Sequence, residues 1–481
     1  MRFKSLKMGP GVLILLVFTG CVSMAPDYQA PDLGVETPQS YQQASTDLES
    51  IYSDDRWWEA FDDPELNQLV EAVLHNNWDI KQTAARILET RYRYLQVRSD
   101  RYPDLNLEAG YDRRKTGGGR IDQGAKFDTY DVGLAAAYEV DLWGRLASES
   151  KAAWNDVLQA EENRRTIAQT VVAETAVLYL QIEALERRLQ IAYESVEAFQ
   201  RSLDFVNIRF KRGLVSALDV RQARRILAGA DARIPQLEQD LGQNQQQLSV
   251  LLGRYPETHP PRTQPEDYYQ RLAPVPPGLP SDLLMRRPDI QSAEIRLKAL
   301  NDRIGSAKAA RFPTITLTGS YGYASSELNS LITNNSEFWD LTLRLFQPIF
   351  DAGRLEANQR AVEARYQEQA AVYAKSVLTA FEEVEASLLA RKKQLERRER
   401  FLRFLNEARA TQRVAQNRYI KGLTSYLDVL DAQQTRFEAE DSLALVDLAV
   451  LTNRVDLHRA LGGGWAQPEP VEPEKVGWFN F

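Results

Sequence analysis

Few residues of this 481-residue chain have the types and spacing that support chemistry. The three histidines, His75, His259 and His458, lie far apart in the sequence, which argues against a metal cluster or a histidine relay. The glycine run at 117–119 lacks the Lys-Ser/Thr that follows in a phosphate-binding loop, and no nucleophile elbow is found. We therefore expect no enzymatic activity, no metal and no cofactor.

The single cysteine, Cys21, follows a segment typical of a secretory signal. Basic residues precede an apolar run at 12–18, which is too short to span a bilayer. Residues 18–21, FTGC, resemble a bacterial lipobox, although leucine is usual where Phe18 stands. We expect acylation of Cys21; a plain signal peptide with an incidental cysteine is the alternative. Val22 and Ser23 replace the aspartate that commonly retains lipoproteins at the inner membrane, which indicates the outer membrane.

The bulk composition narrows the classes of partner. A net charge of −8 gives no reason to expect nucleic acid, because phosphate binding needs clustered positive charge. A hydrophobic share of 43% is sufficient for folded structure. Beyond the N-terminal signal, no segment is apolar enough to predict a transmembrane helix.

The most informative pattern is a twelve-residue sequence that occurs twice. It reads RFKRGLVSALDV at 209–220 and RYIKGLTSYLDV at 418–429, and shorter sequences recur at the same offset. We interpret the chain as two diverged copies of one unit of roughly two hundred residues.

Each copy is predicted to contain a long helical hairpin that turns at this repeated sequence. Residues 354–420 hold no glycine or proline and would form a helix of roughly 100 Å; the first-copy equivalent is 145–211. Apolar residues along these helices and their return helices alternate spacings of four and three, as in coiled coils. Pro235 predicts a kink or bulge in the first return helix.

Two details of the hairpins are also predicted. Ser216 to Asp219 and Ser425 to Asp428 have the pattern of capping boxes that start the return helices. One asparagine falls at the matching place of the seam in both copies, at 244 and 453. It would either fix the register of the coiled coil or face a wet lumen.

Alternating apolar residues predict two pairs of strands, one just before each long helix. Every second residue is apolar in 130–140 and 339–345, and the partner strands are expected at 105–111 and 315–321. Strands with one apolar face and terminal aromatics are typical of transmembrane barrels; an ordinary half-buried sheet is the alternative. Four strands cannot close a barrel, and lipid does not tolerate open edges, so a membrane location would require oligomerisation.

These features, together with the middle segment PGLPSDLLMRRPDI at 277–290, resemble the TolC-like outer membrane factors, and within them the OprM/NodT lipoprotein branch. The resemblance covers nearly the whole mature chain and departs at Met285, where an acidic residue is usual. It implies a mainly α fold with a membrane β-barrel contribution, in which a homotrimer builds a twelve-stranded barrel and a periplasmic α-helical barrel.

The resemblance divides the chain into ten parts. They are a signal peptide (1–20), a lipid-anchored N-terminal arm (21–63), a helix of the α-barrel (64–103), the first strand pair (104–143), the first helical hairpin (144–253), a proline-rich equatorial segment (254–280), a second helix of the α-barrel (281–311), the second strand pair (312–350), the second hairpin (351–463) and an equatorial tail (464–481).

The resemblance also implies a periplasmic gate at the hairpin tips. Its acidic ring falls on Asp428 and Asp431, and its tethering contact on Tyr419 with Asp219. Helix capping alone would also explain Asp219 and Asp428. Helix capping does not require an acidic residue at position 431, because the first-copy counterpart of Asp431 is Gln222. Three chains would place several carboxylates around a narrow throat, which raises the local cation concentration.

The turn residues match the family's contact with a periplasmic adaptor protein. They are Gly213, Leu214, Gly422 and Leu423, although glycine after a helix C-terminus with an apolar cap would explain them equally. Thr424 replaces an arginine that tethers the gate in some members, and the strength of the closed-state latch is therefore open.

The resemblance implies an exit duct of a tripartite efflux system that exports drugs or other small molecules. Its partners would be two further copies of the chain, the adaptor, an inner-membrane transporter and outer membrane lipid, with no nucleic acid. The alternatives are an exit duct for type I protein secretion and a lipid-tethered periplasmic coiled-coil scaffold without a channel.

Overall fold

The structure is a computed structural model that describes residues 23–31, 34, 40–42, 56–115, 117, 125–263 and 286–463. The predicted signal peptide, Cys21, most of the proline-rich segment and the tail from 464 lie outside the described residues.

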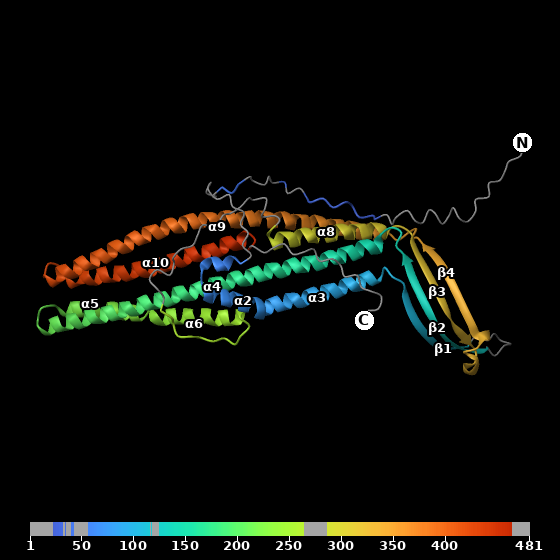
Figure 1. Cartoon of the computed structure of the whole chain (residues 1–481), viewed down its shortest axis with the longest axis horizontal. Helices are drawn as coiled ribbons and strands as arrows, with labels where there is room; N and C mark the ends of the chain where they lie inside the picture. The colour runs from blue at the N-terminus through green and yellow to red at the C-terminus, as the bar shows by residue number, and fades with distance from the viewer. Residues whose placement is uncertain are drawn as a thin grey trace.

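Two very long helices run along most of the molecule (Figure 1). Helices α4 (Arg145–Lys211) and α9 (Arg354–Ile420) have 67 residues each, which corresponds to roughly 100 Å. Both have the spans that the sequence predicts. Each follows a glycine in the left-handed conformation, Gly144 with φ of 69° and Gly353 with φ of 82°. A side chain would disfavour that backbone, so these glycines fix where the helices begin.

The two return segments differ. In the second hairpin the return is one helix, α10 (Tyr426–Ala460), whereas in the first it consists of α5 (Ala217–Asp231) and α6 (Ile234–Leu251). The predicted break is confirmed: Pro235 lies in the first turn of α6, where its missing N–H has no helical partner to lose.

Both seam asparagines bond the facing long helix. Asn453 is buried, and its Nδ2 donates to the carbonyl oxygen of Ser387 on α9 (3.1 Å). Asn244 donates to Gln181 on α4 (3.4 Å). These contacts favour the register role of the asparagines over a wet surface.

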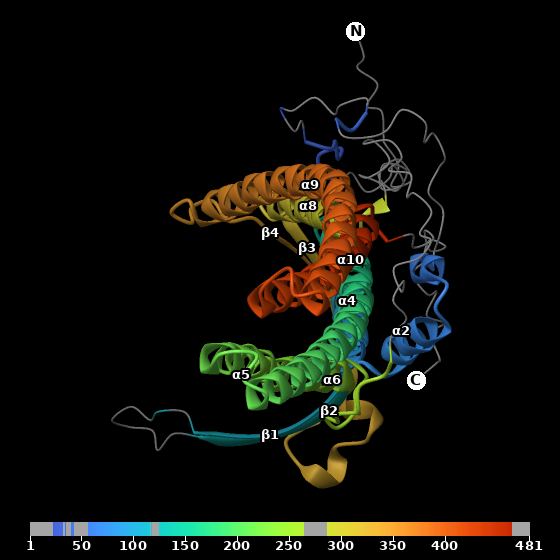
Figure 2. The ribbon, with the colours of Figure 1, turned by 90° about the vertical axis from the view of Figure 1, so that its left-hand side faces the viewer.

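Shorter helices pack on this frame. They are η1 (Trp57–Phe61), α2 (Pro64–Asn76), α3 (Trp78–Ser99) and α8 (Pro288–Ala309). Helix α8 lies along α4 and α9, and α3 lies along α4. Seen along the long axis, α9, α10, α4 and α5 follow one another in a curved row, with α2 on the convex side (Figure 2).

A four-stranded antiparallel sheet stands at the end opposite the hairpin tips (Figure 1). Its strands are β1 (Asp104–Lys115), β2 (Lys126–Val140), β3 (Thr314–Ser325) and β4 (Glu337–Phe346), paired in chain order. The short helices η2 (Leu328–Ser330) and η3 (Asn334–Ser336) lie between β3 and β4. Both predicted pairs are present, and β2–β3 pairing joins them into one sheet.

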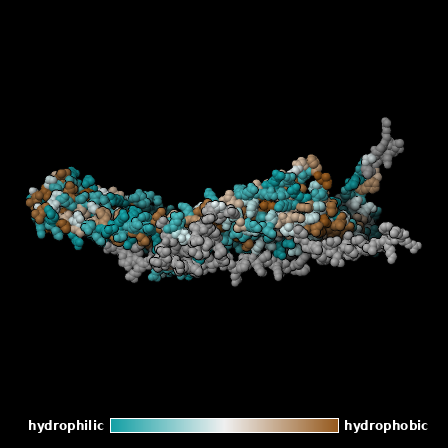
Figure 3. Space-filling model, turned by 90° about the horizontal axis from the view of Figure 1, so that it is seen from above, coloured by the Kyte–Doolittle hydropathy of each residue, from teal (hydrophilic) through white to brown (hydrophobic). Residues whose placement is uncertain are grey.

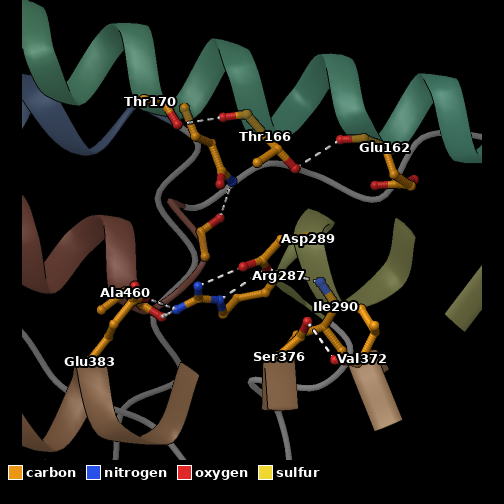
Figure 4. Close-up of polar contacts among 12 residues, drawn as sticks. Glu162, Thr166, Thr170, Arg287, Asp289, Ile290, Val372, Ser376, Glu383 and Ala460 are labelled. Atoms are coloured by element: carbon orange, nitrogen blue, oxygen red, sulfur yellow. Dashed lines mark hydrogen bonds and ion pairs between the residues drawn. The ribbon is translucent and has the colours of Figure 1, made fainter. Parts of the chain in front are cut away.

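Arg287 joins three helix segments near the middle of the molecule (Figure 4). Its side chain is buried. Its guanidinium donates to Asp289 at the start of α8 (2.7 and 3.0 Å) and to Glu383 on α9 (2.6 Å). It also donates to the carbonyl oxygen of Ala460, at the last residue of α10 (3.1 Å). One cation therefore holds three helix segments and caps the C-terminus of α10.

A second ionic cluster fastens the segment 254–263 and the start of α2 to α4. The hydroxyl of Tyr179 donates to Asp63, the N-cap residue of α2 (2.7 Å). Arg262 pairs with the buried Glu186 (Nε–Oε2 3.0 Å) and with Glu65. The cluster thus brings carboxylates from two helices around a single arginine.

Glu183 on α4 lies beside this cluster and titrates abnormally. Burial raises its pKa to about 7, with the charge of Asp63 as a further cause, whereas a glutamate in water has a pKa of about 4.3. The folded protein therefore holds this proton more tightly than the unfolded chain. Stability should fall as the pH rises from about 4.3 to 7, and the loss is complete above that window.

We predict that Glu183→Gln stabilises the protein at pH 8, by on the order of 2 kcal/mol, and has little effect at pH 4. The measurement is the unfolding midpoint of the purified protein in detergent at both pH values. Glu174→Gln is the matched control, because Glu174 is exposed on the same helix. A midpoint difference that is the same at both pH values would contradict the assignment.

Candidate functional site

The two hairpin tips have the same backbone turn. Gly213 and Gly422 follow α4 and α9, each with φ of +71°. The amide of each glycine donates to the carbonyl three residues earlier (2.9 Å), and the amides of Leu214 and Leu423 donate to the carbonyl five residues earlier (3.0 and 2.9 Å). This is the Schellman arrangement that ends a helix. It leaves both leucine side chains exposed, by 60% and 62%.

Capping boxes follow directly, as the sequence predicts. Asp219 accepts a hydrogen bond from the backbone N–H of Ser216 (2.8 Å) at the start of α5, and Asp428 accepts from that of Ser425 (3.0 Å) at the start of α10. The hydroxyl of Thr424 also donates to Asp428. These bonds, from Thr424 first and then Ser425, lower the pKa of Asp428, which is therefore ionised at neutral pH.

The left-handed turn predicts opposite effects of two glycine substitutions. Gly422→Ala should destabilise the protein by about 1 kcal/mol, because alanine disfavours positive φ. Gly229→Ala, inside α5 with open space around the added methyl group, should stabilise it by about 0.5–1 kcal/mol. Thermal unfolding of both variants checks the pair, and equal shifts would refute this description of the tip.

The acidic candidates occupy different environments at the tips. Asp431 lies exposed on α10, three residues after Asp428, and makes no hydrogen bond or ion pair with the described residues. It is thus free of the capping role that Asp428 fulfils. Its first-copy counterpart, Gln222, is half-buried on α5.

Tyr419, at the end of α9, is buried between the two hairpins. Its ring lies 4.9 Å from that of Tyr426 and 6.0 Å from that of Phe205 on α4, centroid to centroid. Its hydroxyl has no hydrogen-bond partner in the described part of the chain. The pKa of Tyr419 is raised, chiefly by burial and further by the negative charge of Asp219, whereas the positive charge of Arg209 opposes the rise. Tyr419 and Asp219 therefore make no hydrogen bond with each other in the described structure.

Arg209 is a tip residue that the sequence analysis did not single out. Its guanidinium carbon lies 4.9 Å from the centroid of the Tyr419 ring. The only sequence signal was its position at the start of the repeated twelve-residue sequence, where Arg418 stands in the second copy. That signal did not reveal which partner the arginine contacts.

The four-stranded sheet has one apolar face. Leu107, Leu134, Tyr321 and Trp339 are cross-strand partners in one row, with exposed fractions of 74%, 44%, 48% and 73%. Such neighbours share a face of a sheet because side chains alternate along each strand. Large apolar groups are thus exposed across the whole width of the sheet. In a space-filling view, hydrophobic residues gather toward both ends of the molecule (Figure 3).

The next row along the sheet points to the opposite face and is small or polar. It consists of Asn106, Ala135, Ser320 and Asp340, and the hydroxyl of Ser320 donates to Asp340. The sheet therefore has an apolar face and a polar face. Separately, none of the helices in the described parts of the chain has the length and hydropathy needed to cross a membrane.

The chain is similar to known proteins along nearly its whole length. The family model described as "Outer membrane efflux protein" matches residues 69–254 and 279–463. The probable outer membrane lipoprotein SilC of Salmonella typhimurium is 33% identical over 461 residues, covering 94% of this chain and 98% of SilC. The toluene efflux pump outer membrane protein TtgI of Pseudomonas putida is 36% identical over 477 residues, covering 97% and 99% of the two chains.

A solved structure is also similar to this chain over most of its length. A crystal structure of CusC, from work on its folding and transmembrane channel formation, superposes with a TM-score of 0.83 at 32% identity. The superposition covers 92% of this chain and 100% of that one.

Proposed function

The chain belongs to the outer membrane efflux protein family and is an outer membrane efflux channel, and from that premise we propose that three copies form the exit duct of a tripartite pump. The duct carries small molecules and catalyses no reaction. The observation that carries the proposal is the exposed apolar row that begins at Leu107 and ends at Trp339. A channel needs this lipid-facing surface, and a periplasmic scaffold does not.

The edges of the sheet support closure by more than one copy of the chain, and the resemblance gives their number as three. Strands β1 and β4 each pair on one side only within the described chain, which leaves a row of backbone N–H and C=O groups at both edges. Unpaired backbone groups are not tolerated in lipid, and bacterial barrels start at about eight strands. Three copies that pair β4 with the next β1 make a closed barrel of twelve strands. The hairpins below it then form a helical tunnel.

We predict that Leu341→Lys and Thr342→Lys, neighbours on opposite faces of β4, have different effects. Leu341 lies on the same face of β4 as Trp339, where lysine should cost up to ~2–4 kcal/mol at mid-bilayer and reduce insertion. Thr342 faces the polar side, so its variant should insert normally. The fraction of trimer recovered in outer membranes measures both. Equal recovery would contradict the proposed lipid face.

The tips supply the gate and the docking end. Asp428 and Asp431 would form the acidic ring, since both carboxylates are exposed and three chains contribute six. The tethering contact that the resemblance places on Tyr419 with Asp219 lacks a hydrogen bond in the described structure, and Tyr419 would hold the two hairpins in the closed arrangement through its ring. The exposed Leu214 and Leu423, each after its turn glycine at 213 or 422, would contact the periplasmic adaptor, which in turn connects to an inner-membrane transporter.

The N-terminal arm would connect the channel to its lipid anchor at Cys21. Segment 23–31 lies along α8: the carbonyl oxygen of Pro26 accepts from Asn301 (2.6 Å), and Ala25 approaches so closely that a Cβ on Gly305 would lie 2.5 Å from it. Ala25 and Pro26 are thus held against α8, four and five residues after the proposed acylation site. Most of the predicted equatorial segment 254–280 and all of the predicted tail 464–481 lie outside the described residues.

Single-channel recording in planar bilayers tests the duct and its acidic ring together. The wild type should form cation-preferring channels, because negative charge at a narrow throat concentrates cations. Asp431→Gln, which introduces the residue of the first copy, should lower the cation preference, and adding Asp428→Asn should lower it further. Glu438→Gln on the same helix is the control.

The outcomes separate the two parts of the proposal. A wild-type protein without channel activity would exclude the duct. Channels with the same cation preference in the wild type and the double variant would exclude the acidic ring and leave the duct intact.

A further inference from the structure

A cation–aromatic contact joins the two hairpins at their tips. Arg209 is two residues from the end of α4, and Tyr419 is one residue from the end of α9. The guanidinium carbon of Arg209 lies 4.9 Å from the Tyr419 ring centroid and 6.0 Å from that of Phe205. Both distances are within the range of cation–π attraction.

The guanidinium of Arg209 contacts the aromatic rings of Phe205 and Tyr419. The Nε of Arg209 is buried and has no hydrogen-bond partner in the described part of the chain. Tyr419 is 7% exposed and Arg209 is half-buried, so the contact is partly desolvated. Cation–π attraction is stronger at desolvated sites than in water, where it competes with hydration of the cation.

The polar groups near this contact are engaged elsewhere. The carboxylate of Asp219 accepts from the backbone and hydroxyl of Ser216 (2.8 and 2.7 Å), and the hydroxyl of Thr424 donates to Asp428. The hydroxyl of Tyr419 bonds neither of them. The ring face of Tyr419, rather than its hydroxyl, is therefore the part that contacts the first hairpin.

We propose that Arg209 is a gate-positioning residue that holds the closed channel by stacking on the ring of Tyr419. The inference rests on the proposed function of the tips as the gate. Because Arg209 belongs to the first hairpin and Tyr419 to the second, separating the hairpins breaks this contact. Each capping box and each Schellman turn lies within a single hairpin, so this movement does not break them.

Two pairs of variants test the contact by single-channel recording in planar bilayers. Arg209→Gln should raise the ratio of open to closed channels at least about tenfold, whereas Arg209→Lys, which keeps a cation, should stay within about threefold of the wild type. Tyr419→Phe keeps the ring and should leave gating unchanged. Tyr419→Leu removes the ring and should open the channel as Arg209→Gln does.

Arg212→Gln is the matched control. It removes the same charge at the same tip from an exposed arginine. If Arg209→Gln and Arg212→Gln open the channel equally, a general charge effect replaces the proposed contact. If Tyr419→Phe opens the channel as much as Tyr419→Leu, the hydroxyl is the latch and the inference is overturned.

Amide hydrogen exchange of residues 413–420 provides a readout that does not need conductance. Faster exchange in Arg209→Gln than in Arg212→Gln is expected, and equal exchange would overturn the inference. A wild type without channels would refute the proposed duct, while this comparison would still decide whether Arg209 holds the tips together.

Discussion

The backbone groups at the two edges of the sheet, which have no strand partner among the described residues, constrain the rest of the molecule. Lipid offers no hydrogen-bond partners, so in the proposed barrel β1 and β4 pair with strands of other copies of the chain. The proposed closure by three copies would arrange the helices below the sheet in a ring as well. Each chain then supplies a curved wall whose long helices start directly after the strands, at Arg145 and Arg354.

Helices of this length need lateral fixation, and buried ions supply much of it. Arg287 holds α8, α9 and the end of α10 at mid-height, and Arg262 ties a connecting segment to α4. Nearer the tips, α9 and α10 are joined by Arg398 with Asp447 (2.6 Å) and by Arg409 with the buried carboxylate of Glu440 (2.9 Å). Removing one partner of such a pair leaves an uncompensated charge, so these contacts resist sliding of one helix along the other.

Local signals were sufficient for the elements but not for their tertiary contacts. The ends of α4 and α9 were predictable because a glycine and a capping box mark each boundary within a few residues. The strands followed from strict alternation. The β2–β3 pairing, the buried site of Arg287 and the contact between Arg209 and Tyr419 join residues far apart in sequence. No local sequence pattern specifies such partners. An arginine in the repeated sequence is equally consistent with a solvent-exposed charge.

The break between α5 and α6 gives the two hairpins different mechanics. A continuous α10 against α9 behaves as a stiff rod, because bending it would strain a whole ladder of backbone hydrogen bonds. The first hairpin has a compliant joint at residues 232–233, where that ladder is interrupted. The mechanical difference between the hairpins lies in their return helices alone, since α4 and α9 are both continuous over 67 residues.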